Sequence, residues 1–306
     1  MDFSSLIHSS NQYTNQLLFY RPYTQSAMIK SSDIFDISIS ESNIFQKSEN
    51  LEVDFEITTL DFSYYYPISR SLEFTFNYPF YYISRGFLDN FLNSVHSSLK
   101  IETTRENEGH KDNQLQYRVT DAIYKDSAYY VSGNPQLELK YNFYRYNSLY
   151  IATNIGIKIP LGSVEDGFTT KKIDLMVGIE LQKNYNQFSI ISNAIVIFNG
   201  DYRLSSDIIS KKYRYFLSLG SQVSVDYFLD LDFINDTSFL FTYQYSSAPY
   251  ESRDEKFSSY THLLQFALRE QLDDGEHIDI FFNQNTIPRH NEADVTFGLS
   301  YYFKGL

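Results

Sequence analysis

Histidine is the residue of this sequence best suited to catalysis or metal binding, and it occurs six times. None of the six has the HExxH or HxH spacing that brings two imidazoles to one metal ion. No serine-containing nucleophile signature surrounds His262 or His277. Isolated histidines are more often structural, so we predict no catalytic residue, no metal and no cofactor. The six are His8, His96, His110, His262, His277 and His290.

Charged side chains form a second candidate set, because they recur at every other position in segments whose remaining positions are apolar. If these positions line a common interior, the side chains can pair with one another or, in an open lumen, attract cations, since acidic residues dominate. The predicted lumen-lining residues are Glu52, Asp54, Glu56, Glu73, Glu138, Lys140, Lys158, Asp174, Glu180, Arg214, Asp226, Arg269 and Asp279.

The segments that carry these charges have a two-residue period. Apolar residues alternate with polar ones over 51–57, 72–78, 137–143, 173–181 and 295–303. A transmembrane strand shows this pattern over about ten residues, because alternate side chains face lipid and lumen. We therefore predict an all-β fold, a transmembrane antiparallel β-barrel, in which the apolar residues of each segment, Leu51 to Ile57 included, face lipid.

Composition supports this class. Aromatic residues make up 18% of the chain, with 28 Tyr and 26 Phe, while no run approaches the ~18 apolar residues of a spanning helix. Cysteine is absent, which excludes disulfides and thiolate sites. The net charge of −13 argues against a nucleic-acid partner.

Turn signals divide the chain into twelve strands joined alternately by short and long links. Residues 114–124 have strand character, but an odd strand count would invert every later loop, so we assign them to a long external loop, 83–134. With an even number of strands, both termini are periplasmic. The alternation of apolar and polar residues changes parity near Thr58 and Thr59, which predicts a bulge. The strands are expected at about 33–44, 51–66, 69–82, 135–145, 148–160, 172–183, 187–199, 212–226, 236–246, 259–270, 276–285 and 294–303.

The last strand resembles the terminal signal that the barrel-assembly machinery reads during insertion. Its features are Thr296, then Gly298, then Tyr301 and the final aromatic Phe303. The alternative is an ordinary closing strand with a chance match. We predict the assembly machinery and outer-membrane lipid as partners, and the bacterial outer membrane as the location.

Three segments resemble the domain-of-unknown-function 3187 family of bacterial outer-membrane β-barrel proteins. They are Asn11-Gln12 with Leu17-Leu18-Phe19-Tyr20, the block from Gly86 to His96, and the terminal stretch from Asp294 to Phe303. Family members tend to have Trp before the histidine, where this chain has Val95. The resemblance implies location and fold and supplies no catalytic residues.

One helix is expected within the long loop, over 86–99. Phe87, Leu88, Phe91, Leu92 and Val95 fall on one face at helical spacing. In an external loop, such a helix would form a lid over the pore mouth or a shelf in the outer leaflet. The alternative is a helix that packs on its own loop.

Residues 1–32 precede the barrel domain, 33–306, and are long for a simple tail. Polar amides surround Leu17 to Tyr20, and Arg21 and Lys30 could pair with luminal carboxylates. We predict a luminal plug, with a disordered tail as the alternative. The first residues lack a basic stretch followed by an apolar one, so we interpret the chain as a mature form.

Two classes of function remain open. The barrel is a passive channel or binding barrel for a small solute, or it is a non-conducting structural or assembly partner of other envelope proteins. An open acidic lumen favours the first and a fully paired lumen the second. An outer-membrane lipid hydrolase is less favoured, because no preorganised nucleophile or metal site is visible.

Overall fold

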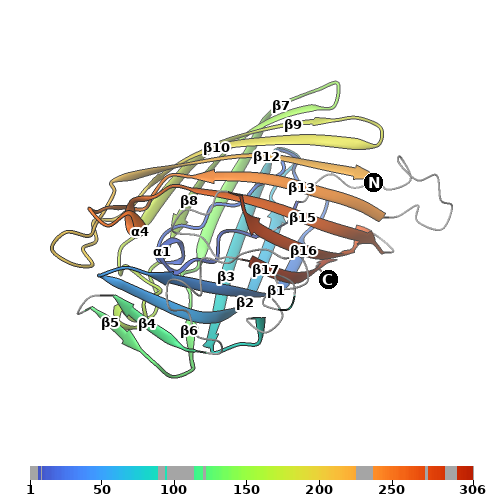
Figure 1. Cartoon of the computed structure of the whole chain (residues 1–306). Coiled ribbons are helices and arrows are strands. Elements are labelled where there is room, and N and C mark those ends of the chain that lie inside the picture. Colours follow the sequence, from blue (N-terminus) through green and yellow to red (C-terminus); the bar gives the residue numbers. More distant parts are fainter. Residues whose placement is uncertain are drawn as a thin grey trace.

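Twelve long antiparallel strands pair edge to edge until the first meets the last (Figure 1). This computed structural model describes residues 6, 7, 9–88, 94, 114–119, 122–224, 237–272, 275–286 and 295–305. The barrel strands are β1 (Ile34–Lys47), β2 (Leu51–Pro67), β3 (Leu72–Ser84), β7 (Gln136–Tyr146), β8 (Leu149–Lys158), β9 (Asp174–Asn184), β10 (Phe188–Phe198), β12 (Tyr213–Ser224), β13 (Thr237–Ser246), β15 (Thr261–Gln271), β16 (His277–Asn285) and β17 (Val295–Lys304).

The twelve predicted strands are confirmed, each within a few residues of its expected bounds. Closure comes from β17, which pairs with β16 on one side and with β1 on the other, in a register that joins Ile34 to Lys304 and Asn43 to Val295. A closed barrel leaves no unpaired edge facing lipid, which is why the backbone can cross a membrane. Among the described residues, no helix is long and apolar enough to do so.

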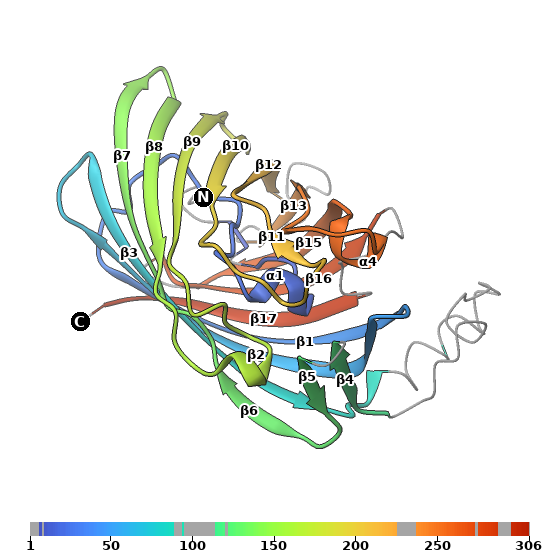
Figure 2. The same cartoon turned by 90° about the vertical axis from the view of Figure 1, so that its left-hand side faces the viewer.

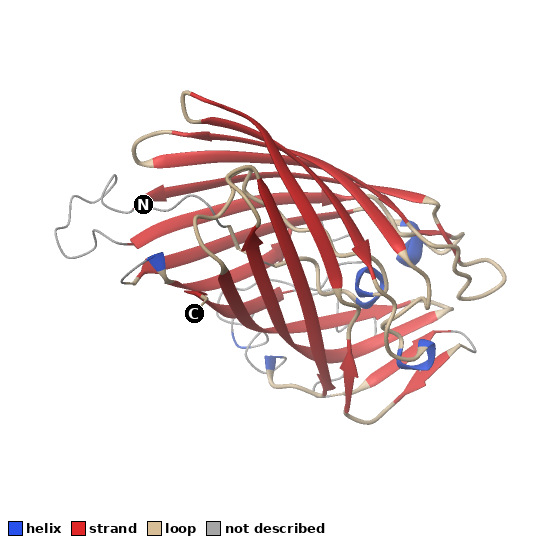
Figure 3. Ribbon diagram, turned by 180° about the vertical axis from the view of Figure 1, so that it is seen from behind, coloured by secondary structure: helices blue, strands red, loops and turns tan. Residues whose placement is uncertain are grey.

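The connections distinguish the two ends of the barrel. At one, here called the turn end, lie the links 68–71, 147–148 and 185–187, and Gly305 donates its backbone N–H to Asp33. At the other, the loop end, lie the longer connections 159–173, 199–212 and 247–260. Figure 3 shows this contrast. The alternation of short and long links follows the prediction, with exceptions at β1–β2, where the link is a three-residue turn, and at β12–β13, where residues 225–236 separate the two strands.

The outer surface carries the residues that lipid requires. Aliphatic side chains and several phenylalanines, Phe266 among them, are exposed across its middle, and aromatic side chains are also exposed toward both ends, as in other transmembrane barrels. The exposed aliphatics include Ile155, Val177, Ile179, Leu219, Leu268, Ile280 and Leu299. Phe35, Tyr66, Tyr146 and Tyr185 are exposed toward the turn end, and Phe80, Phe198, Tyr213 and Tyr260 toward the loop end.

The first half of β2 is inverted relative to the prediction. Leu51, Val53, Phe55 and Ile57 are almost fully buried on the face that also carries Asp61, which points into the lumen. The prediction that Glu52, Asp54 and Glu56 line the lumen is therefore wrong. The physical reason is that this part of β2 extends past the lipid band, where an apolar interior and a polar exterior replace the membrane pattern.

The predicted bulge near Thr58 is also absent from the pairing of β2. Its register with β1 and with β3 runs without a shift through this point. The apolar residues switch from one face of β2 to the other there because the continuous strand passes out of the lipid band. A register shift occurs instead between Asn142 and Tyr144 of β7.

The long connection after β3 adds short strands outside the ring. β4 (Gln116–Val119) pairs with the extended part of β2 and with β5 (Ile123–Lys125), and β6 (Tyr129–Ser132) pairs with β3. Residues 114–124 thus belong to the connection and not to the ring, as predicted. A small separate sheet joins β11 (Ile209–Ser210) to β14 (Tyr250–Glu251) at the loop end.

The other short elements also lie toward the loop end. They are α1 (Thr14–Leu17), the 3-10 helix η2 (Val164–Asp166) and α4 (Glu255–Ser258). The predicted helix of the long loop falls mostly outside the described residues, including its Phe91, Leu92 and Val95. Phe87 is exposed, and Leu88 packs on Val295.

Gly86 and the two residues after it lie against Glu56. The backbone N–H groups of Phe87 and Leu88 donate to its carboxylate at 2.8 and 2.6 Å. Gly86 has a φ of +66°, and a Cβ there would overlap the same side chain. Glu56 therefore anchors the start of the long connection on the outer face of β2.

Candidate functional site: the barrel lumen

Nine of the predicted lumen-lining residues are buried on inward-facing strand positions. Asp226 lies outside the described residues, and the three acidic residues of the first half of β2 face outward. The nine are Glu73, Glu138, Lys140, Lys158, Asp174, Glu180, Arg214, Arg269 and Asp279.

Three ion pairs join neighbouring strands on the luminal face. Each pair is almost completely removed from solvent, so each charge depends on its partner for compensation. The pairs are Lys140–Glu73 at 2.7 Å, Lys158–Asp174 at 3.0 Å and Arg269–Asp279 at 2.7 Å.

The chain ahead of β1 runs inside the ring of strands (Figure 2). Of its described residues, 6, 7, 9, 10, 12–27 and 30 are buried. Residues 6, 7 and 9–13, here called the first arm, run toward the loop end, where α1 reverses the chain. Residues 18–30, the second arm, return toward the turn end and lead into β1.

Arg21 of the second arm makes the most specific contact with the wall. Its guanidinium donates to both carboxylate oxygens of Asp61, at 3.1 and 2.9 Å, and to the Asn77 side chain at 2.7 Å. This is a bidentate, charge-assisted pair, the strongest common type of side-chain hydrogen bonding.

Lys30 closes the second arm near the turn end. Its backbone N–H donates to Glu73 at 2.9 Å, and its ammonium group lies 3.9 Å from the same carboxylate. The ammonium also lies 3.9 Å from the ring centroid of Tyr65, within cation–π range. Glu73 therefore holds Lys30 of the segment and Lys140 of the wall together.

Glu138 receives two side chains from the second arm. The Tyr20 hydroxyl donates to one carboxylate oxygen, and the Gln25 amide donates to the other at 2.5 Å. Gln25 also exchanges two backbone bonds with the Asn193 side chain, at 2.8 and 2.9 Å. A side-chain amide thus pairs with the segment backbone much as a neighbouring strand would.

Two basic residues of the wall bind carbonyl groups of the segment. Lys158 donates to the backbone oxygen of Leu18 at 2.9 Å, and Arg214 donates to that of Tyr20 at 2.7 Å. Arg214 also donates to the Gln16 side chain at 2.8 Å. The backbone of this irregular stretch therefore has wall partners in place of strand pairing.

The first arm meets a wall of neutral amides. Gln244 and Gln265 donate to the Ser9 carbonyl at 3.3 and 2.9 Å, and Asn283 donates to its hydroxyl at 2.7 Å. Leu6 and Ile7 pack in a small apolar cluster with residues of β10, β13, β15 and β16. The described residues of this arm, 6, 7 and 9–13, carry no charged side chain, so this arm is held by weaker interactions than the second.

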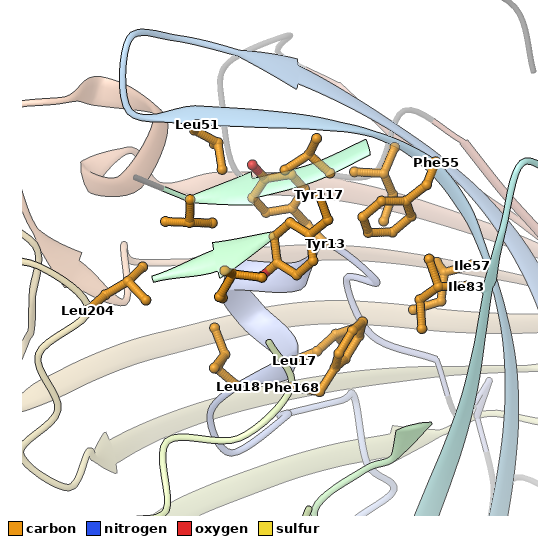
Figure 4. Packing of buried hydrophobic residues seen from close by; sticks show 14 of the residues in the cluster. Tyr13, Leu17, Leu18, Leu51, Phe55, Ile57, Ile83, Tyr117, Phe168 and Leu204 are labelled. Carbon is orange, nitrogen blue, oxygen red and sulfur yellow. The ribbon is translucent and has the colours of Figure 1, made fainter. Parts of the chain in front are cut away.

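The loop end of the lumen is closed by an apolar cluster, shown in Figure 4. It joins Tyr13, Leu17 and Leu18 of the segment to the inward side chains of β2 and to residues from the loop-end connections. Burial raises the pKa of Tyr202 to about 12 and that of Tyr250 well above its usual range, so both loop hydroxyls stay protonated. The connections contribute Tyr117, Phe168, Leu204, Ile208, Tyr250 and Phe257.

Two glycines make room for the segment at the wall. A Cβ at Gly156 would lie 2.6 Å from the Tyr20 hydroxyl oxygen, and one at Gly220 would lie 3.1 Å from Leu6. The distance at Gly156 is shorter than Cβ atoms adopt in folded proteins, so a side chain at this position would displace Tyr20. The absence of a side chain at position 156 is what lets the second arm lie against β8.

Two cavities beside the segment are each about 20 Å³, with room for a single water molecule. One lies between the start of the segment and β13 and β15, near Gln244. The other lies beside Gln25 and Lys140 on the opposite side. At these two places, the segment fills the space between itself and the wall nearly completely.

The two described histidines lie on opposite faces of the barrel wall. His262 is on the outer face, among the rings of Tyr243, Tyr245 and Tyr260. His277 is in the lumen, where it stacks on Tyr302 with ring centroids 4.3 Å apart. Within the described ranges, no group of three His, Asp or Glu side chains is arranged to hold a metal.

The prediction did not identify the neutral luminal residues or Asp61. Asn193, Gln244 and Gln265 each touch the segment, yet amides carry no charge to single them out. The alternation could have identified Asp61 as a luminal residue, because it is acidic and lies in the second half of a strand whose alternate positions are aromatic. Its partner Arg21 was predicted to pair with a luminal carboxylate, but the prediction did not say which carboxylate.

The fold and the luminal face define this protein as a barrel of the outer-membrane type. The chain belongs to the family described as protein of unknown function (DUF3187), whose model matches residues 5–304. No curated protein matches it.

Solved structures show the same fold at low sequence identity. The COG4313 outer membrane channel from Pseudomonas putida F1 aligns with a TM-score of 0.59 and 11% identity, covering 93% of this chain and 97% of that one. The NanC porin aligns with a TM-score of 0.55 and 8% identity, covering 89% and 100%. Both similarities establish the barrel architecture.

Proposed function

We propose that this protein is an outer-membrane channel for small solutes whose lumen is closed at rest by residues 6–32. The observation that carries the proposal is the docking of an irregular segment on a charged wall through Arg21–Asp61 and Lys30–Glu73. The alternation of short and long links supports an orientation with both termini in the periplasm. Outer-membrane lipid and the barrel-assembly machinery are the partners that such a barrel requires.

The segment is bound to the barrel wall through side chains and not through strand pairing, so it can leave the barrel without disrupting the ring. None of its described residues is a member of the strand pairing that closes the ring, so its withdrawal breaks no strand ladder. The first arm is held by neutral hydrogen bonds and a small apolar cluster. Neutral hydrogen bonds each contribute about 1 kcal/mol net, so this arm is the part that leaves first.

A non-conducting structural role is the second candidate, and the same packing favours it. If the segment never leaves, the lumen is a polar core and the barrel serves as a scaffold in the membrane. An enzymatic role has less support, because the hydroxyl that is hydrogen-bonded to a histidine in the described chain, Tyr243 with His262, lies on the outer face of the barrel and not in the lumen.

Deletion of residues 2–30 tests the choice between channel and scaffold. The barrel ring should still assemble, as judged by heat-modifiable gel mobility, because the deletion removes no strand pairing. Single-channel conductance in planar bilayers should rise severalfold over that of the full chain. An assembled deletion variant whose conductance equals that of the full chain would favour the scaffold.

A further inference from the structure

The charges of the lumen are divided unevenly between the wall and the segment. Among the buried, inward-facing strand positions that the structure describes, seven are acidic and four are basic. The segment brings two cations, Arg21 and Lys30, and both are docked on wall carboxylates. The acidic positions are Asp36, Asp61, Glu73, Glu138, Asp174, Glu180 and Asp279, and the basic ones are Lys140, Lys158, Arg214 and Arg269.

The acidic excess lies on one side of the barrel. Asp61, Glu73 and Glu138 come from the consecutive strands β2, β3 and β7, and Asp174 and Glu180 from β9. Lys140 and Lys158 are the basic residues of this side. The opposite side, from β12 to β16, carries mainly amides and hydroxyls together with Arg214 and the Arg269–Asp279 pair.

The second arm of the segment now occupies the charged side. Arg21, Tyr20 and Gln25 donate to Asp61 and Glu138, so their departure takes hydrogen-bond donors and positive charge away from carboxylates that stay behind. Glu180 is completely buried, and neither of its oxygens has a hydrogen-bond partner within the described chain. Its carboxyl group is therefore open to whatever enters the vacated space.

We propose that the lumen, once the segment is displaced, selects cations, and that Asp61, Glu138 and Glu180 set this selectivity. The inference rests on the proposed function and names the class of solute. Carboxylates in contact with water are ionised at neutral pH. A narrow passage with acidic walls between low-dielectric lipid focuses the field and concentrates cations.

The test compares ion permeabilities in planar bilayers, with potassium chloride as the probe. In a salt gradient, the variant lacking residues 2–30 should show a K⁺-to-Cl⁻ permeability ratio severalfold above 1. Adding Asp61→Asn, Glu138→Gln and Glu180→Gln to the deletion should bring the ratio close to 1. The matched control, Glu165→Gln with Glu251→Gln and Glu270→Gln, removes three exposed carboxylates and should leave the ratio high.

A second variant covers the case in which the deletion fails to assemble. Full-length protein with Arg21→Glu and Lys30→Glu keeps every strand and repels the segment from Asp61 and Glu73, so its openings should show the same cation preference. Assembled variants that do not conduct would contradict the proposed function and this inference with it. Conducting variants with a permeability ratio at or below 1, or a ratio insensitive to the three luminal substitutions, would overturn the inference alone.

Discussion

Arg21→Met should undock the segment while leaving the barrel intact. The substitution keeps most of the side-chain length but removes the guanidinium that donates to Asp61 at 3.1 and 2.9 Å. Removing one partner of a buried pair costs about 3–5 kcal/mol, because the other charge stays buried without compensation. At about 1.4 kcal/mol for each factor of ten, the ratio of docked to undocked segment should fall by roughly two to three and a half orders of magnitude.

The assay is the open probability of single channels, recorded for both single variants and the double variant. Asp61→Asn alone should also raise the open probability, since it leaves Arg21 buried without its carboxylate. The double variant, Arg21→Met with Asp61→Asn, should fall back toward the original protein, because no charge is then stranded. Single variants with an unchanged open probability would refute the reasoning, as would a double variant at least as open as the singles.

Other predictions concern packing and assembly. Gly156→Leu should raise conductance by displacing Tyr20, whereas the same change at Gly275, where a Cβ would lie 3.7 Å from the Lys304 side chain, should not; equal conductances would argue against the close approach. Phe55→Ala should lower stability by about 3–5 kcal/mol in urea unfolding while Glu52→Gln has little effect, and similar losses would contradict the inverted face of β2. Phe303→Asp should impair membrane assembly far more than Lys304→Asp, because residue 303 faces lipid, and equal assembly of the two would remove the case for a terminal signal. The protein should require detergent for extraction and run with heat-modifiable mobility on gels, and a detergent-free soluble monomer would contradict the barrel.

Two-residue periodicity was enough to predict the ring of strands, because lipid and a polar lumen impose opposite demands on alternate positions. Val295 to Phe303 and the 173–181 segment show why: every second residue must meet hydrocarbon. The same logic failed at Leu51 to Ile57. There the strand has left the membrane, the lumen is filled by Tyr13 and Leu17, and apolar residues belong inside.

The lumen could be predicted only in part for a related reason. Parity identifies which side chains point inward, but it does not say which of them meet. Arg21 was recognisable as a cation in need of a carboxylate, yet its pairing with Asp61 depends on the path of an irregular segment that has no period. Asn193 and Gln265 contact the segment through amides, whose role depends on geometry alone.

A reversible disulfide between the segment and the wall tests the central claim most directly. The chain has no cysteine, so Gln25→Cys with Asn193→Cys introduces the one possible bridge, at positions where the backbone of one residue is hydrogen-bonded to the side chain of the other. We predict that this bridge forms on oxidation, that the oxidised protein does not conduct, and that channel openings appear after reduction. Failure of the assembled protein to form the bridge, or equal conductance before and after reduction, would contradict a segment that closes the lumen.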